Sequence, residues 1–233
     1  MHMIPKSIGI IPDGNRRLAK RLLKEPWKGH ELGIKKLYSV LEWCGELGIK
    51  NVTFYALSLE NMEKRPREEL DFIFLLAKHE LDQILSDKSH LVHRNKVRLV
   101  FFGRLDLLPE DLQKKISQAM EMTKGYSKYT ASFAMAYGGR QEIVEAVKKL
   151  FRSSKSDKDI NEKAFRQFLQ TNGFVDPDLI IRTGGEKRLS NFLPFQSVYS
   201  ELAFIDTYWP ELGKEEFIKA IRDFSERQRR FGK

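Results

Sequence analysis

Cysteine is almost absent from this chain, whose 233 residues include only Cys44. A single cysteine cannot close an intramolecular disulfide or assemble a cysteine-ligated metal cluster, which favours a reducing compartment. Long apolar runs are also missing, since no stretch of about 18 apolar residues occurs. Residues 1–6 lack the apolar region of a signal peptide. We therefore expect a cytoplasmic protein without a membrane-spanning helix.

The composition favours one folded domain over residues 1–233. Hydrophobic residues make up 41% of the chain and charged residues 31%, which excludes a disordered chain and supplies material for a sizeable core. The formal net charge of +9 suits an anionic partner, whether nucleic acid, acidic lipid head groups or a phosphorylated small molecule. We expect no nucleic-acid partner, because the sequence contains no helix-turn-helix, zinc-binding or aromatic–basic RNA-binding pattern.

Short apolar runs that predict strands alternate with amphipathic patterns that predict helices along the whole chain. The expected strands are residues 8–12, 52–57, 97–102, 130–137, 179–181 and 202–205. The expected helices are residues 31–47, 66–85, 110–124, 141–151, 162–169 and 214–231. This alternation predicts an α/β fold with a central, mostly parallel six-stranded sheet flanked by helices. Ligands of such sheets bind beyond the carboxyl ends of the strands, where this chain is rich in glycine, arginine and carboxylate.

The first expected strand runs into Asp13-Gly14-Asn15-Arg16-Arg17. Gly14 and Asn15 permit a tight turn, so backbone N–H groups at the start of a helix can bind an anion, and the two arginines add charge for a diphosphate. An acid beside a phosphate site is suited to Mg²⁺, which shares its remaining ligands with phosphate oxygens. Taken alone, this motif is more often an ordinary turn after a strand.

Two arginines flank a glycine-rich segment after the strand at residues 179–181. Arg182 and Arg188 lie six positions apart, and Ser190 follows two positions later. Two guanidinium groups and a hydroxyl can grip both phosphates of a diphosphate, and the glycines let the backbone approach closely. A glycine turn with solvated arginines is an equally good interpretation of this segment alone.

Polar side chains also occur near two other predicted element ends. His30 lies near the start of the helix at residues 31–47, where its imidazole can donate to a phosphate, although an isolated histidine is more often structural. Ser58, Glu60 and Asn61 follow the second strand, where they can orient a substrate or relay a proton. Capping of a helix or turn by serine and asparagine is at least as good an explanation.

Together these motifs form an ordered set over nearly the whole chain. Its most specific part is the block at residues 178–192, and it also includes Gly29-His30-x-x-Gly33, Arg65-Pro66, Tyr137-Gly-Gly-Arg140, Glu201-Leu and Arg227-x-x-Arg-Phe-Gly232. In this order, the set resembles the cis-prenyltransferase family of the undecaprenyl diphosphate synthase (isoprenyl transferase) type.

The resemblance implies a transferase that adds isopentenyl diphosphate repeatedly to an allylic diphosphate, farnesyl or geranylgeranyl diphosphate, with Mg²⁺ as cofactor. The implied product is a long-chain cis-polyprenyl diphosphate, the precursor of a glycosyl carrier lipid. The family also implies a homodimer whose subunits hold a hydrophobic tunnel for the growing chain. Burial of each five-carbon unit stabilises the bound product by roughly 4 kcal/mol. The product is therefore expected to leave slowly, through a transient, peripheral contact with a membrane surface.

The resemblance also assigns roles residue by residue. Asp13 matches the catalytic acid that binds Mg²⁺, Glu201 matches a second Mg²⁺ ligand, and Asn61 matches a proposed proton acceptor. The residues that match the allylic diphosphate site are Gly14, Asn15, Arg16, Arg17, Leu18, His30, Ser58, Leu59, Glu60, Met62 and Arg65. Those that match the isopentenyl diphosphate site are Arg182, Arg188, Leu189 and Ser190. Residues 230–232 resemble a C-terminal motif that reaches the partner's site.

In three places the chain departs from the family pattern, one of them being Leu18, where a tryptophan is usual. Pro26 stands where many members have an arginine, so the neighbouring Lys24 or Lys28 would have to supply that phosphate contact. Lys64 has the spacing expected for a family arginine, whereas Arg65 lies one position later, and either can serve.

Two alternative functions remain at this point, a catalytically silent subunit and a basic binder of nucleic acid or lipid surfaces, and the second would need none of these motifs. A catalytically silent subunit of a heteromeric prenyltransferase is disfavoured. Such subunits tend to lose the acid and the two arginines that this chain keeps as Asp13, Arg182 and Arg188. The wide apolar stripe of residues 66–85 fits a tunnel wall and fits ordinary core packing equally well.

Overall fold

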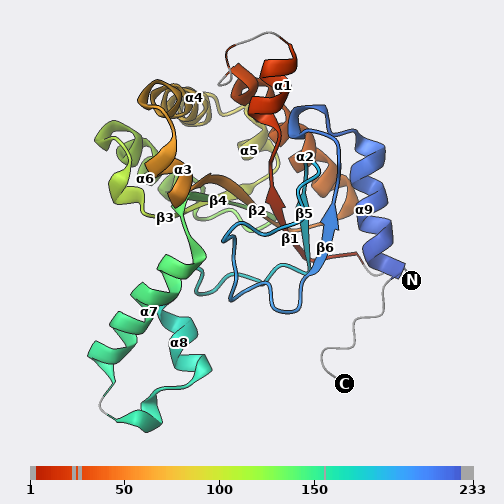
Figure 1. Cartoon of the computed structure of the whole chain (residues 1–233). Helices are drawn as coiled ribbons and strands as arrows, with labels where there is room; N and C mark the ends of the chain where they lie inside the picture. Colours follow the sequence, from red (N-terminus) through yellow and green to blue (C-terminus); the bar gives the residue numbers. More distant parts are fainter. Residues whose placement is uncertain (1–3, 23–24, 26–27, 155, 227–233) are drawn as a thin grey trace.

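Six strands form one sheet at the centre of the molecule (Figure 1). The computed structural model describes residues 4–22, 25, 28–154 and 156–226. The strands are β1 (Ser7–Ile11), β2 (Asn51–Ser58), β3 (Val97–Gly103), β4 (Tyr129–Tyr137), β5 (Leu179–Arg182) and β6 (Glu201–Phe204). Every pairing is parallel, in the order β3-β4-β2-β1-β5-β6. The predicted α/β class is confirmed, and the described sheet is parallel throughout.

Helices connect these strands. They are α1 (Asn15–Arg21), α2 (Gly29–Leu47), α3 (Leu59–Lys64), α4 (Arg67–Ser86), α5 (Leu91–Arg94), α6 (Glu110–Thr123), α7 (Gly139–Ser153), α8 (Glu162–Phe168) and α9 (Lys214–Glu226). The short helices α3 and α5 were not predicted, because they have too few turns to show a periodic pattern. The helix predicted at residues 214–231 is described as far as Glu226, and its remaining residues lie outside the described part of the chain.

The two faces of the sheet are buried against different parts of the chain. Side chains alternate between the faces along a strand, so Ile8 and Ile10 of β1 pack in one core cluster with α2 and α9, while Ile11 packs in another. Helices α4 and α6 pack against β3 and β4. Phe192 and Leu193 join the cluster that contains Ile11. Strands buried on both faces are continuous apolar runs, which explains why β1 was recognisable from sequence.

Helices α7 and α8 extend away from the sheet as an arm (Figure 1). Val144, Val147 and Phe151 of α7 are exposed, and Phe151 is 77% exposed. Apolar side chains gathered on one projecting helix are typical of a surface that contacts another molecule. In the described part of the chain, no helix combines the length and the apolar character that crossing a bilayer requires.

The loops after β1, β2 and β5 meet at one edge of the sheet, because β1 lies between the other two strands and all three are parallel. Asp13 follows β1, Ser58 ends β2, and Thr183 follows β5. The topology therefore brings together motifs that are as much as 170 residues apart in the sequence.

Candidate active site

Asp13 is held at this edge by the loop that follows β5. The Asp13 backbone N–H donates to Thr183 Oγ1 at 3.0 Å, and that hydroxyl donates to the Asp13 carbonyl oxygen at 2.8 Å. Arg182 Nη2 donates to Asp13 Oδ2 at 2.9 Å. The Asp13 carboxylate is 29% exposed, so it is fixed on one side and accessible on the other.

Arg182 connects Asp13 to Arg188 and Ser190, two other residues that the sequence predicts to bind isopentenyl diphosphate. It is 4% exposed, and its Nη1 donates to Ser190 Oγ at 2.7 Å and to the Arg188 carbonyl oxygen at 2.5 Å. Its Nε finds no hydrogen-bond acceptor among the described residues. The Arg188 guanidinium is 59% exposed and pairs with Glu186. The structure thus brings Arg182 and Ser190 together, whereas Arg188 contributes its backbone here and leaves its charge at the surface.

Arg17 approaches Asp13 from the opposite side. Arg17 Nη2 lies 3.1 Å from Asp13 Oδ1, and its guanidinium stacks over Tyr208 at 5.1 Å from the ring centroid. Gly184, at φ 85°, lets this arginine approach, since a Cβ there would lie 2.6 Å from Arg17 Nη2. Gly14 has φ 110° and would place a Cβ 2.7 Å from Tyr208. The two glycines are therefore required by space as well as by backbone conformation.

A second group of cations converges on Glu69, a residue that the sequence did not single out. Glu69 is 1% exposed, and its carboxylate lies 3.2 Å from His30 Nε2, 3.4 Å from Arg65 Nε and 3.6 Å from Arg16 Nε. Arg65 therefore lies with His30 and Arg16, while Lys64 is exposed. Of Lys64 and Arg65, the structure places Arg65 in this group, and which of the two contacts a phosphate stays a prediction.

Burial and charge shift the titration of this group. Burial lowers the pKa of His30 below its ordinary value, although the hydrogen bond with Glu69 opposes the shift. Burial also works to raise the pKa of Glu69, but the His30 hydrogen bond and the charges of Arg65 and Arg16 outweigh it and lower that pKa. Glu69 is therefore a carboxylate that organises two arginine guanidinium groups and the His30 imidazole, whose charged form burial disfavours.

The segment after β2 has mixed roles. Ser58 Oγ accepts a hydrogen bond from the Asn61 backbone N–H at 3.0 Å, so Ser58 caps α3, as the capping interpretation predicts. The Asn61 side chain is exposed. Glu60 Oε1 accepts from Asn191 Nδ2 at 2.8 Å. Partial burial works to raise the pKa of Glu60, but hydrogen bonds, including this one, lower it overall.

The apolar residues assigned to the two sites pack inside the protein. Leu18 is 3% exposed and its backbone N–H donates to the Gly14 carbonyl oxygen, so it offers no free polar group to a diphosphate. Leu59 is half-buried, and Met62 packs against the cluster formed with α4 and α6. Leu189 packs beside the cluster of Phe192.

Glu201 is not brought to Asp13. It opens β6 and pairs in register with Leu179, the first residue of β5, whereas Asp13 follows the last residue of β1. The two carboxylates therefore belong to opposite ends of the sheet within one subunit. Among the described residues, no group of three histidine, cysteine or acidic side chains could hold a metal ion.

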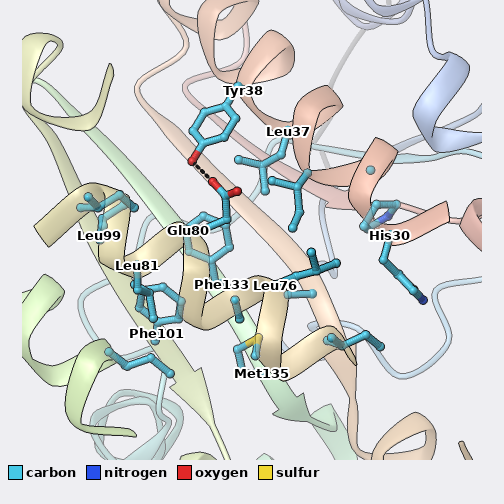
Figure 2. A pocket seen from close by; sticks show the side chains of 18 of the residues that line it. His30, Leu37, Tyr38, Leu76, Glu80, Leu81, Leu99, Phe101, Phe133 and Met135 are labelled. Carbon is cyan, nitrogen blue, oxygen red and sulfur yellow. Dashed lines mark hydrogen bonds between the residues drawn. The ribbon is translucent and has the colours of Figure 1, made fainter. Parts of the chain in front are cut away.

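An apolar pocket begins beside the Glu69 group and runs between α2 and α4 (Figure 2). Its volume is about 190 Å³. Asn15 and His30 line it together with Leu37, Leu76, Leu81, Leu99, Phe101, Phe133 and Met135. Asn15 Oδ1 is buried without a hydrogen-bond partner among the described residues. The stripe of residues 66–85 is therefore a pocket wall as well as part of the core.

One polar pair interrupts this apolar lining. Tyr38 of α2 donates a hydrogen bond to Glu80 of α4 across the pocket (Figure 2). Burial and this hydrogen bond raise the pKa of Tyr38. His90 Nε2 lies 3.2 Å from the same phenol oxygen. Sequence reasoning missed this pair because each residue appears as an ordinary polar position of an amphipathic helix.

The sequence contains a weak indication of the Glu69 contact, since Glu69 lies four residues after Arg65 at the start of a helix.

Residues 11–232 match the family model described as "Putative undecaprenyl diphosphate synthase". The chain is 46% identical over 234 residues to the tritrans,polycis-undecaprenyl-diphosphate synthase (geranylgeranyl-diphosphate specific) of Thermococcus kodakarensis, a match covering 99% of this chain and 88% of that protein. It is 47% identical over 234 residues to the protein of the same name from Methanopyrus kandleri, covering 99% and 85%.

Solved structures give the same result. Lavandulyl diphosphate synthase from Lavandula x intermedia, in complex with dimethylallyl diphosphate, superposes with a TM-score of 0.90 at 32% identity and 99% coverage of both chains. A probable undecaprenyl diphosphate synthase from Campylobacter jejuni superposes with a TM-score of 0.81 at 35% identity and full coverage of both chains. The chain is therefore a prenyltransferase that belongs to the undecaprenyl diphosphate synthase family.

Proposed function

We propose that this enzyme condenses isopentenyl diphosphate repeatedly with geranylgeranyl diphosphate to make a long-chain cis-polyprenyl diphosphate, the precursor of a glycosyl carrier lipid. The observation that carries the proposal is the position of Asp13 between two cationic groups, Arg182 with Ser190 and the Glu69 group. Two diphosphates can bind at these groups with one acid between them. The names of the relatives from Thermococcus and Methanopyrus support geranylgeranyl diphosphate as the primer, with farnesyl diphosphate as the alternative.

We assign the allylic diphosphate to Arg16, His30 and Arg65, because this group opens onto the apolar pocket. A diphosphate bound there can place its prenyl tail between α2 and α4, where each five-carbon unit gains roughly 4 kcal/mol on full burial. Arg65 Nε lies 3.4 Å from Glu69 Oε1 as an ion pair but makes no hydrogen bond to a described residue, so this buried donor can turn to a phosphate oxygen. The predicted hydrophobic tunnel is an extension of this pocket.

We assign isopentenyl diphosphate to Arg182, Ser190 and Arg188. Arg182 is buried and fixed, so its guanidinium provides a pre-oriented charge. Arg188 is exposed and pairs with Glu186, so binding requires its side chain to exchange this partner for a phosphate. Charge-assisted contacts of this kind are worth about 1.5 to 3 kcal/mol each.

Asp13 fits Mg²⁺ in the way expected for a metal shared with substrate. Its carboxylate contacts Arg182 and Arg17, and Mg²⁺ needs only one or two protein carboxylates when diphosphate oxygens and water complete its shell. When bound, the ion stabilises the charge that develops on the departing allylic diphosphate. Arg17 and Arg182 hold the Asp13 carboxylate in position by direct contacts.

Asn61 is proposed to help remove the proton that isopentenyl diphosphate loses when the new double bond forms. Its exposed side chain lies in the turn that Ser58 caps, close in sequence to Glu60. The hydrogen bond from the Asn61 backbone N–H to Ser58 fixes the start of α3 and hence the origin of this side chain.

We propose a homodimer, supported by the exposed apolar side chains of the α7–α8 arm. Glu201 lies on β6, an edge strand, so its predicted role as a metal ligand depends on a site shared across a dimer. Phe151→Glu is expected to give a monomer with reduced activity, measured by analytical ultracentrifugation and turnover. Met122→Glu, a change of another exposed apolar residue on α6, is the matched control. A fully active monomer would refute the shared site.

We also propose a transient contact with a membrane surface, because a long apolar product leaves a pocket for water only at a high cost. The enzyme is expected to release product faster when lipid vesicles are present. This is measured as steady-state turnover with and without vesicles, at equal substrate concentrations.

The experiment that tests the function incubates purified protein with labelled isopentenyl diphosphate, Mg²⁺ and either primer, and then sizes the products by chromatography. We expect long products, a preference for geranylgeranyl diphosphate and no product after chelation of Mg²⁺. Asp71→Asn, at an exposed acid of α4, is the control for Asp13→Asn. No incorporation with either primer would favour the interpretation as a silent subunit.

A further inference from the structure

Asn191 follows Ser190 and occupies an unusual backbone conformation. Ser190, Asn191 and Leu193 have φ values of 50°, 67° and 49°, in the left-handed region that residues other than glycine rarely adopt. Asparagine tolerates this conformation better than serine or leucine. Such a segment persists only where the surrounding structure holds it, so the contacts of Asn191 are informative.

Asn191 uses its side chain and its backbone to join three segments. Its Nδ2 donates to Glu60 Oε1 at 2.8 Å, and its Oδ1 accepts from the Arg140 backbone N–H at 2.8 Å. Its carbonyl oxygen accepts from the Gly139 backbone N–H at 2.9 Å. Asn191 thereby connects the loop after β5 to the end of β2 and to the start of α7.

The start of α7 has no side chains where Asn191 packs. A Cβ on Gly138 would lie 2.9 Å from Asn191 Nδ2, whereas a Cβ on Gly139 would lie 2.0 Å from Pro194 Cδ and 3.1 Å from the Asn191 carbonyl oxygen. Gly138 therefore makes room for the Asn191 side chain, and Gly139 makes room chiefly for Pro194 and also for the Asn191 carbonyl.

Asn191 lies between two parts of the candidate site. On one side, the preceding residue Ser190 accepts a hydrogen bond from Arg182, which in turn contacts Asp13. On the other side, Glu60 precedes Asn61. The Glu60 carboxylate thus links two segments. One is the loop that contains Ser190, and the other is the helical turn that contains Asn61, the proposed proton acceptor.

We infer that Asn191 is a positioning residue that holds Ser190 and the Glu60–Asn61 turn in register, so that one contact aligns isopentenyl diphosphate with the group that removes its proton. This inference rests on the proposed function. Asn191 itself touches neither substrate. Its loss should impair isopentenyl diphosphate use and the chemical step together, while leaving primer binding intact.

Asn191→Asp isolates the contact. Aspartate also tolerates the left-handed region, and its carboxylate still accepts from Arg140 N–H, but it has no donor for Glu60 and places like charges together. We expect the KM for isopentenyl diphosphate to rise and kcat to fall, each about tenfold, with an unchanged KM for the allylic primer. Unchanged kinetics, or an equal rise in the primer KM, would overturn the inference.

The decisive variant is the double change Asn191→Asp with Glu60→Gln. Glutamine can donate its amide hydrogen to the new aspartate, so the contact returns with reversed polarity. We expect the double variant to recover most of the activity that Asn191→Asp loses. Glu60→Gln alone keeps an acceptor for Asn191 and measures what the Glu60 charge contributes by itself. A double variant no better than Asn191→Asp would refute a role for this contact.

A direct binding measurement separates this inference from the function on which it rests. Calorimetric titration with isopentenyl diphosphate reports its affinity without turnover. Weaker binding in Asn191→Asp, restored in the double variant, supports the positioning role even before product is measured. If the unmodified enzyme binds isopentenyl diphosphate but makes no product, the proposed function fails, while the binding comparison still tests Asn191.

Discussion

Glu69 should contribute more to the stability of this enzyme than any exposed acid on α4. Its carboxylate is 1% exposed and faces the His30 imidazole and the guanidinium groups of Arg65 and Arg16 at 3.2 to 3.6 Å. Glu69→Gln keeps the size of the side chain but leaves Arg65 and Arg16 without their shared anion. Removing one partner of a buried ion pair costs about 3 to 5 kcal/mol.

Exposure of Arg16 to solvent reduces the expected loss of stability. Arg16 is close to half exposed, so its contact contributes little, and the charge of Arg65 accounts for most of the effect. We therefore expect a loss of about 3 kcal/mol, which corresponds to a Tm lower by roughly 6 to 12 °C for a domain of this size. Glu68→Gln, at the adjacent exposed glutamate, should leave Tm unchanged.

The assay is thermal unfolding with and without inorganic diphosphate. Diphosphate replaces the missing negative charge, so it should raise the Tm of Glu69→Gln more than that of the unmodified enzyme. Because the folded-state pKa of Glu69 is lowered from its ordinary value of 4.5, its stabilisation is complete above pH 4.5 and is lost as the pH falls through the lower, folded value. Equal Tm values for Glu69→Gln and Glu68→Gln at neutral pH would refute the reasoning.

Three further predictions concern the substrate contacts. Asp13→Ala should lower kcat far more than it raises the primer KM, because the charge it helps to stabilise develops in the transition state; the reverse pattern in initial-rate kinetics would contradict a metal role. Arg188→Ala should raise the KM for isopentenyl diphosphate roughly 10- to 150-fold, whereas Arg182→Ala should also lower kcat, since Arg182 holds Asp13. Replacing both Lys24 and Lys28 with alanine should raise only the primer KM at low ionic strength. Lys28 contacts Glu31 and the Phe72 ring in the structure. An unchanged primer KM would show that Arg16, Arg17 and His30 suffice. Lys24 lies outside the described residues.

Residues close together in sequence were predicted well. The turn after β1 and the arginine-rich loop after β5 were recognisable because each is a short motif next to an apolar run. Their proximity followed from a general rule, that the carboxyl ends of parallel strands meet at one edge. The contact between Arg182 and Asp13 is the result of that rule at the level of single atoms.

The sequence predicted less about residues whose contacts come from distant parts of the chain. Arg188 is predicted to bind a diphosphate, and the sequence did not show that its exposed guanidinium pairs with Glu186, a partner it has to exchange for the phosphate. Glu201 was predicted to be a second metal ligand near a dimer interface; within one subunit the register of β5 and β6 places it at the other end of the sheet from Asp13, and its role stays a prediction. Neither outcome is visible in a local pattern, because side-chain direction and strand register are set by packing across the sheet.

The sequence by itself determined the α/β class, the strands and longer helices, and the family, because these depend on local periodicity and on motifs in a fixed order. Tertiary structure decided which residues act as a unit. It placed Arg65, and not Lys64, against Glu69, buried Glu69 among two arginines and His30, and set Asn191 against Glu60. Each of these contacts joins side chains on different elements or different helical turns, and its strength comes from exclusion of water, which only the folded chain provides.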